Sequence, residues 1–159
     1  MRLSTKGRYA VMAMADLARN GRAEAGDARA VSLAEIAARK EISLSYLEQL
    51  FARLRKAGLV LSVRGPGGGY RLARTPAETA VADIVLAVDE PIRAVRCAVQ
   101  GTPRGCMAGG ERCITHWLWE DLGAEIHAYL AAVSLEDVVM KRTGLRRRAA
   151  PVLTEGAAA

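Results

Sequence analysis

The stretch ISLSYLEQLFARLRKAGLVLSVRGPGGGYRLAR, residues 42–74, decides the fold of this chain. Its first half places apolar residues at the spacing i, i+3, i+4, i+7, which is one face of a helix: Leu47, Leu50, Phe51 and Leu54. Ser43 can cap the start of this helix, and Gly58 can end it. We therefore expect a helix across the first half of the stretch.

The second half predicts a β-hairpin. Leu59–Val63 and Tyr70–Arg74 are strand-like, and the glycine-rich turn Arg64–Gly69 joins them. The glycines allow the backbone to approach a phosphate, and Arg64 can enter a minor groove. The simpler alternative is a flexible turn. A nucleotide-binding P-loop is disfavoured because the Lys-Ser/Thr pair is missing and no helix follows the turn.

Two earlier segments complete a helix-turn-helix pattern. Apolar residues at helical spacing between Gly7 and Gly21 predict a first helix. Ser32 and Glu35 form a capping-box pattern that begins a short second helix. A hairpin directly after such helices is the wing of a winged helix, whereas an ordinary helical hairpin is the alternative. The predicted fold is mainly α with a small β-hairpin: a winged helix-turn-helix domain followed by a metal-binding loop and a long dimerisation helix.

The predicted 43–57 helix has a polar face that can contact DNA. That face and the hairpin supply the candidate DNA-binding residues, which are Ser45, Tyr46, Glu48, Gln49, Arg53, Lys56 and Arg64. The formal charge of the 159-residue chain is +6, which favours a polyanionic partner such as double-stranded promoter DNA. A solvated charged face is the alternative, because such faces are common on helices.

The rest of the chain predicts two further helices, one more capped turn at Ser134 and Asp137, and a tail. An apolar stripe at Val81, Ile84, Val85 and Val88 indicates a helix that stops before Pro91. Residues 115–130 predict a longer amphipathic helix with an apolar side made of Leu118, Leu122, Ile126, Tyr129 and Leu130. One small domain does not obviously cover this side, so we expect a homodimer, with intramolecular packing as the alternative. The expected organisation is a DNA-binding domain at 1–78, a linking helix at 79–94, a Cys/His loop at 95–116, a dimerisation region at 117–141 and a disordered basic tail at 142–159.

All three cysteines lie in one glycine-rich segment with one of the two histidines. Cys97, Cys106, Cys113 and His116 are separated by eight, six and two residues, so one loop can wrap round a metal centre. Three thiolates and an imidazole suit structural zinc or a 2Fe-2S cluster, and composition does not decide between them. His127 has no cysteine near it and is expected to be structural.

The sequence also disfavours several classes of protein. No stretch is long and apolar enough to span a membrane, and the N-terminus lacks the pattern of a signal peptide, so we expect a cytoplasmic protein with no membrane partner. No acid-base pair or substrate-pocket motif appears, so we do not expect an enzyme. A zinc-stabilised winged-helix nucleic-acid-binding protein without a sensing role remains the alternative to a cluster sensor.

Several strings resemble the IscR family, bacterial winged-helix transcriptional regulators that bind an iron-sulfur cluster. They are MRLSTKGRYAVMAM, ISLSYLEQLFARLRKAGLV, SVRGPGGGYRLAR, AVDEPI and the cysteine segment that ends in CITHWLWEDL, and the likeness runs from Met1 to about Val139. The chain departs from the family in its inter-cysteine intervals of eight and six residues, where five is common.

The resemblance implies a homodimer that carries a 2Fe-2S cluster and receives it from a cluster-assembly scaffold. It assigns the cluster to Cys97, Cys106, Cys113 and His116, and DNA contacts to Ser45, Glu48, Gln49 and Arg64. In this family the loaded protein represses the genes of iron-sulfur cluster biogenesis, and some target sites distinguish the loaded from the cluster-free form.

Overall fold

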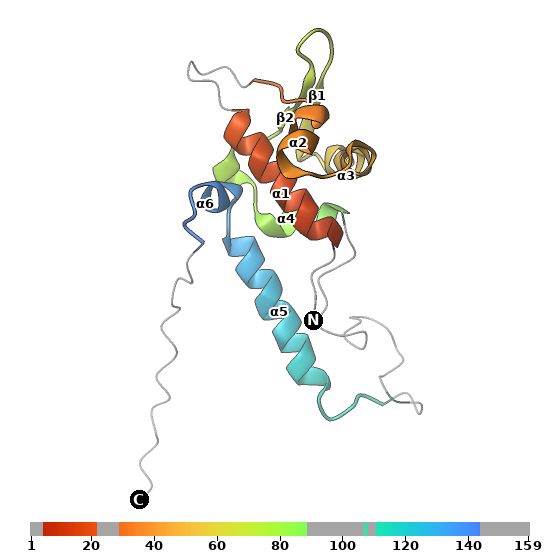
Figure 1. The fold of residues 1–159 in the computed structure, drawn as a ribbon. Coiled ribbons are helices and arrows are strands. Elements are labelled where there is room, and N and C mark those ends of the chain that lie inside the picture. The colour runs from red at the N-terminus through yellow and green to blue at the C-terminus, as the bar shows by residue number, and fades with distance from the viewer. Residues whose placement is uncertain (1–4, 22–28, 89–106, 108–110, 144–159) are drawn as a thin grey trace, which may run out of the picture.

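The computed structural model describes residues 5–21, 29–88, 107 and 111–143. Most of the described chain is helical, and the wing hairpin and α5 lie at opposite ends of the molecule (Figure 1). The elements are α1 (Thr5–Asn20), α2 (Leu33–Lys40), α3 (Leu44–Lys56), β1 (Val60–Val63), β2 (Gly69–Leu72), the 3-10 turn η1 (Pro76–Glu78), α4 (Val81–Val88), α5 (His116–Ala132) and α6 (Leu135–Val139).

The helix starts agree with the capping residues in the sequence. Ser32 and Glu35 form a complete capping box at α2, and the Ser43 hydroxyl accepts a hydrogen bond from the Tyr46 amide at α3. The two strands pair antiparallel, with Val60 opposite Leu72 and Val63 opposite Gly69. The predicted mainly helical fold with a small hairpin is therefore confirmed.

One hydrophobic core joins the winged helix to the later helices. Met14 of α1 and Phe51 of α3 are fully buried in the same cluster as Ile84 and Val88 of α4 and Leu135 of α6. The apolar stripe of the 81–88 segment thus covers the winged helix, as expected from its spacing. The stop predicted before Pro91 lies outside the described residues.

A buried carboxylate fixes α1 against α2. Asp16 is 3% exposed, and Arg39 donates from Nε and Nη2 to its Oδ2 at 3.0 and 2.7 Å. Lys40 Nζ lies 3.1 Å from Oδ1. Burial by itself raises the pKa of Asp16, but the hydrogen bonds and charges of Arg39 and Lys40 outweigh burial, so the pKa lies below its ordinary value.

Val31 pairs with the hairpin through an isolated antiparallel β-bridge to Tyr70. Val31 and Tyr70 exchange two backbone hydrogen bonds of 2.9 and 2.8 Å. A Cβ on Gly69 would lie 2.4 Å from the Val31 carbonyl oxygen, so only glycine allows this approach. The wing is therefore attached to the segment before α2 as well as to α3.

A second backbone clamp closes the excursion that contains α4 and α5. The Val81 amide donates to the Val133 carbonyl at 2.9 Å, and the Leu135 amide donates to the Thr79 carbonyl at 2.8 Å. Residues 80 and 134 therefore lie side by side at the two ends of the segment that contains α4 and α5. Below this clamp α5 extends away from the other helices (Figure 1).

Candidate nucleic-acid interface and metal centre

The N-terminal half of α3 presents three polar side chains to solvent. Ser45, Glu48 and Gln49 are exposed, whereas Leu47 and Leu50 on the other side of the helix are buried in the core. The buried stripe predicted from the sequence therefore determines which residues face outward. A hydroxyl, a carboxylate and an amide side by side can make hydrogen bonds to base edges.

Tyr46 is placed differently from its neighbours. Its ring is half-buried against the core and meets the Tyr9 ring of α1 edge-on, with centroids 5.9 Å apart. This contact positions the start of α3 on α1. The sequence did not indicate the pairing because Tyr9 lies in a different helix.

The basic residues at the end of α3 are also not equivalent. Arg53 Nη1 donates a hydrogen bond of 2.8 Å to the backbone carbonyl of Val88, the last residue of α4. The side chain of Lys56 is exposed and makes no hydrogen bond or ion pair in the described part of the chain. Of the two predicted DNA-binding cations on α3, Arg53 is thus hydrogen-bonded within the protein, and among the described residues Lys56 is not.

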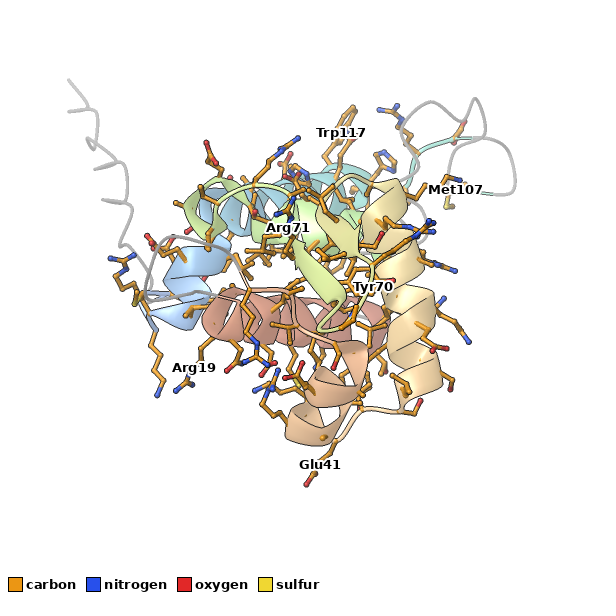
Figure 2. All side chains as sticks on the ribbon, turned by 90° about the horizontal axis from the view of Figure 1, so that it is seen from above. Arg19, Glu41, Tyr70, Arg71, Met107 and Trp117 are labelled. Atoms are coloured by element: carbon orange, nitrogen blue, oxygen red, sulfur yellow. The ribbon has the colours of Figure 1, made fainter. Side chains whose placement is uncertain are left out.

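The wing is held to α3 by an aromatic contact. Tyr70 of β2 meets Phe51 of α3 with ring centroids 4.9 Å apart and an interplanar angle of 63°. Arg64 is exposed at the start of the turn, and Arg71 of β2 is exposed on the strand (Figure 2). The polar row of α3 and the basic wing are therefore parts of one packed unit.

The described part of the predicted Cys/His loop contains Cys113 and His116. The His116 amide donates to the Cys113 carbonyl at 2.9 Å, so a tight turn brings the two residues to the start of α5. Cys97 and Cys106 lie outside the described residues. Within the described ranges no group of three or more His, Cys, Asp and Glu side chains is arranged to hold a metal ion.

His116 is the one buried residue of α5, with 6% of its surface exposed. Its Nε2 lies 3.8 Å from Oε2 of Glu120, one turn along the helix. The Trp117 ring meets the imidazole edge-on at 5.5 Å, and the Arg112 guanidinium lies 4.7 Å from the centre of the Trp117 ring. These contacts fix the orientation of the imidazole.

Thr115 is a neighbour of the candidate ligands that the sequence analysis did not single out. It occupies the N-cap position of α5 but makes no side-chain cap hydrogen bond. Its Oγ1 lies 3.6 Å from the Cys113 sulfur instead. Its place between a cysteine and a histidine was the only signal in the sequence that could have indicated this contact.

Helix α5 carries two apolar faces. Helix α5 packs against α4, and its half-buried residues at helical spacing are Trp119, Gly123, Ile126 and Leu130. Leu118, Leu122 and Tyr129 are exposed on another side, and Trp117 points away from the body of the protein (Figure 2). The single apolar side expected from the sequence is therefore divided between a half-buried face and an exposed face.

None of the helices in the described ranges is long and apolar enough to cross a lipid bilayer.

Comparison with known proteins identifies the family. Residues 3–141 match the model of the Rrf2 family, which is described as iron-dependent transcriptional regulators. The chain belongs to the Rrf2 family. The relatives include HTH-type transcriptional regulators named IscR from Photorhabdus laumondii, 55% identical, and from Escherichia coli O1:K1, 52% identical. Each alignment covers 87% of this chain, and it covers 79% of the first protein and 80% of the second.

Solved structures of Rrf2-type regulators share the fold. IscR of T. potens superposes with a TM-score of 0.69 at 37% identity and covers 89% of this chain and 88% of its own. CymR, the global cysteine regulator of B. subtilis, superposes with a TM-score of 0.71 at 33% identity over 89% of this chain and 98% of its own. The resemblance to IscR regulators and the winged-helix assignment are thereby confirmed.

Membership of the Rrf2 family makes this chain a DNA-binding transcriptional regulator. Its relatives are named as regulators and not as enzymes, in agreement with the expectation from the sequence.

Proposed function

We propose that this protein is a homodimeric regulator that senses iron-sulfur cluster supply in the cytoplasm and binds promoter operators. In this proposal it carries a 2Fe-2S cluster received from a cluster-assembly scaffold. The loaded form represses genes of cluster biogenesis. The observation that carries the proposal is the pairing of an exposed hydrogen-bonding row on α3 with a Cys-x-x-His turn that begins α5 in the same small chain.

The proposed DNA contacts follow from side-chain chemistry. Gln49 can bind adenine through two hydrogen bonds, and Ser45 can bind several bases in the major groove. Glu48 is repelled by phosphate unless it accepts from a cytosine amine, so its effect depends on the DNA sequence. Arg64 in the wing suits a narrow, electronegative minor groove. Tyr46, Arg53 and Lys56 lie on the same helix as the first three residues.

The proposed cluster ligands are Cys97, Cys106, Cys113 and His116. The donor set fits a 2Fe-2S cluster, because thiolates and a neutral imidazole are both known ligands of such centres. Glu120 places a carboxylate oxygen 3.8 Å from Nε2 of His116, and carboxylates are common neighbours of histidine ligands. The Thr115 hydroxyl can donate to the Cys113 sulfur and stabilise its thiolate. When bound, the cluster would supply an exchangeable redox group whose presence reports iron and sulfide supply.

The proposed dimer uses the exposed face of α5. Leu118 is 59% exposed, and Leu122 and Tyr129 follow it at i+4 and i+11 on one side of the helix. A second copy of this helix would bury these residues. The same helix begins at His116. In this proposal a change at the metal site shifts α5, and with it the relative position of the two protomers and the distance between their wings on DNA.

The first experiment is an anaerobic absorption spectrum with iron, zinc and acid-labile sulfide analysis. We expect about two iron and two sulfide per chain in the wild type, the content of a 2Fe-2S cluster, and a perturbed spectrum in His116→Ala. His127→Ala is the matched control, because His127 is exposed on the same helix and should leave the spectrum unchanged.

Zinc in a one-to-one ratio without sulfide, after strictly anaerobic purification, would contradict the cluster. It would instead support a zinc-stabilised winged-helix nucleic-acid-binding protein without a sensing role. Equal effects of the two histidine substitutions would contradict the assignment of His116 as a ligand.

A further inference from the structure

One exposed basic residue of α3, Arg53, is hydrogen-bonded to another helix. Arg53 donates from Nη1 to the Val88 carbonyl at 2.8 Å, and Val88 is fully buried at the C-terminal end of α4. The guanidinium therefore joins the C-terminal part of α3 to α4 through a backbone carbonyl.

Arg53 differs in this respect from its basic neighbours. The side chains of Arg55 and Lys56 are exposed and make no hydrogen bond or ion pair in the described part of the chain. These two remain available for phosphate. The Val88 hydrogen bond uses one of the five N–H groups of Arg53 and restricts where the other four can point.

The contact also joins α3 to α5 through α4. Helix α4 packs against α3 on one side and against α5 on another. The path from Arg53 to Val88 and from α4 to α5 consists of described residues only. The orientation of α3 is thus linked to the helix that carries His116 and the exposed apolar face.

We propose that Arg53 is a positioning residue that holds α3 at a fixed angle to the α4–α5 unit, and is not a phosphate ligand. The inference rests on the proposed DNA contact of α3. The base-reading residues begin at Ser45, eight residues before Arg53, or roughly 12 Å along the helix. A change of tilt at Arg53 displaces these side chains from base edges, where hydrogen-bond geometry is strict.

Loss of the Arg53 contact should therefore reduce sequence-specific binding more than non-specific binding. Loss of a phosphate ligand has a different signature, because it weakens binding to all sequences and lowers the salt slope by about 0.9. These two signatures separate a positioning role from an electrostatic one.

The experiment uses the full-length protein, a DNA duplex selected by the wild type from a random library, and an unselected duplex. Dissociation constants are measured over a series of salt concentrations for the wild type, Arg53→Ala, Arg53→Lys and the matched cation variant Lys56→Ala. We expect Arg53→Ala to bind the selected duplex on the order of tenfold more weakly, the factor for the loss of about one hydrogen bond between a displaced side chain and a base edge. Its affinity for the unselected duplex and its salt slope should match the wild type.

Arg53→Lys keeps a donor that can reach the Val88 carbonyl and should restore most of the lost specificity. If Arg53→Ala does not fold, as judged by thermal unfolding, Arg53→Gln takes its place, because it keeps a donor but no charge. A positioning role predicts the wild-type salt slope for Arg53→Gln, whereas a phosphate ligand predicts a slope lowered by about 0.9.

Three results would overturn the proposal. One is an equal loss on both duplexes with a slope lowered by about one, as for a phosphate ligand. Another is wild-type specificity in a folded Arg53→Ala. A wild type that selects no sequence would contradict the DNA contact of α3 and, with it, this inference.

Discussion

At the scale of single residues, Asp16 couples stability to pH. Its folded pKa lies below the ordinary value of 3.8, because Arg39 and Lys40 outweigh the effect of burial. Such a carboxylate adds stability above its unfolded pKa, and this contribution is lost as pH falls through the folded pKa. The ion pairs of α1 with α2 should therefore weaken only in acid.

The substitution Asp16→Asn tests this coupling. We expect it to lower the free energy of unfolding at neutral pH by about 2 kcal/mol, less than for a fully buried pair because Arg39 and Lys40 are about one-third exposed. The difference from the wild type should shrink as pH falls below 3.8 and through the lowered folded pKa of Asp16, where the wild-type carboxyl also becomes neutral. Urea unfolding at a series of pH values measures it.

Glu136→Gln is the control for Asp16→Asn. The pair of Glu136 with Arg142 is 2.8 Å long but partly exposed, so its loss should change the free energy of unfolding by less than about 1 kcal/mol. A destabilisation by Asp16→Asn that is the same at neutral and acidic pH would show that the carboxylate charge is not its cause.

Residue-level predictions succeeded where the partners are close in sequence. Ser32 with Glu35 and Ser43 with the Tyr46 amide are three residues apart, and both caps are present. Asp16 and Arg39 are 23 residues apart, and no local spacing indicates such a pair. Arg53 was expected to face DNA from its position on the polar side of α3, and its contact with Val88 spans 35 residues.

At the scale of elements, the wing depends on a glycine that has no room for a side chain. Gly69→Ala would place a Cβ 2.4 Å from the Val31 carbonyl oxygen and separate the backbones of Val31 and Tyr70. We expect a loss of about 3 kcal/mol in the free energy of unfolding, the cost of overpacking against backbone. Amide exchange at Val31 and Tyr70 should also become faster, which NMR can measure.

The control for this prediction lies in the same turn. Gly67 has φ +74° and nothing within 4 Å of a Cβ, so Gly67→Ala meets only backbone strain of about 1 kcal/mol. Equal protection of the Val31 and Tyr70 amides in Gly69→Ala and the wild type would contradict the close-approach argument.

Element predictions were accurate where a pattern repeats over several turns. The stripes of α3 and α4 gave both the presence of a helix and its buried side. The strand position at Val31 is a single residue, so it has no period to detect. For α5 the sequence showed that apolar residues were present, but not that Ile126 and Leu130 would be half-buried while Leu118 and Leu122 stayed exposed.

At the scale of the whole molecule, the exposed face of α5 predicts self-association. The double substitution Leu118→Glu with Leu122→Glu would place two like charges in the proposed interface. We expect it to convert a dimer to a monomer at micromolar concentration, measured by sedimentation equilibrium, with little change in the folded core.

His127→Glu is the matched control, because residue 127 lies nine positions, and so half a turn, from Leu118 on the helix. It should leave the dimer intact. A monomeric wild type, or a double variant that remains dimeric, would contradict an interface on this face.

The sequence predicted the two halves of the molecule unequally well. The winged helix is defined by local patterns between residues 5 and 74, and the structure reproduces them. The metal site depends on Cys97 and Cys106, which lie outside the described residues, so its assembly remains a prediction from spacing and family. What the structure adds is the surroundings of His116, including Glu120 and Trp117.

The backbone clamp between Thr79–Val81 and Val133–Leu135 has an evolutionary consequence. The clamp holds both ends of the segment between residues 80 and 134 against the winged helix. Residues can therefore be inserted between α4 and α5 without moving the winged-helix domain. Each doubling of loop length costs only about 0.6 kcal/mol in closure entropy. The longer inter-cysteine intervals of eight and six residues therefore cost little stability. Evolution or protein engineering can therefore replace the proposed metal-binding segment while the winged-helix domain keeps its sequence.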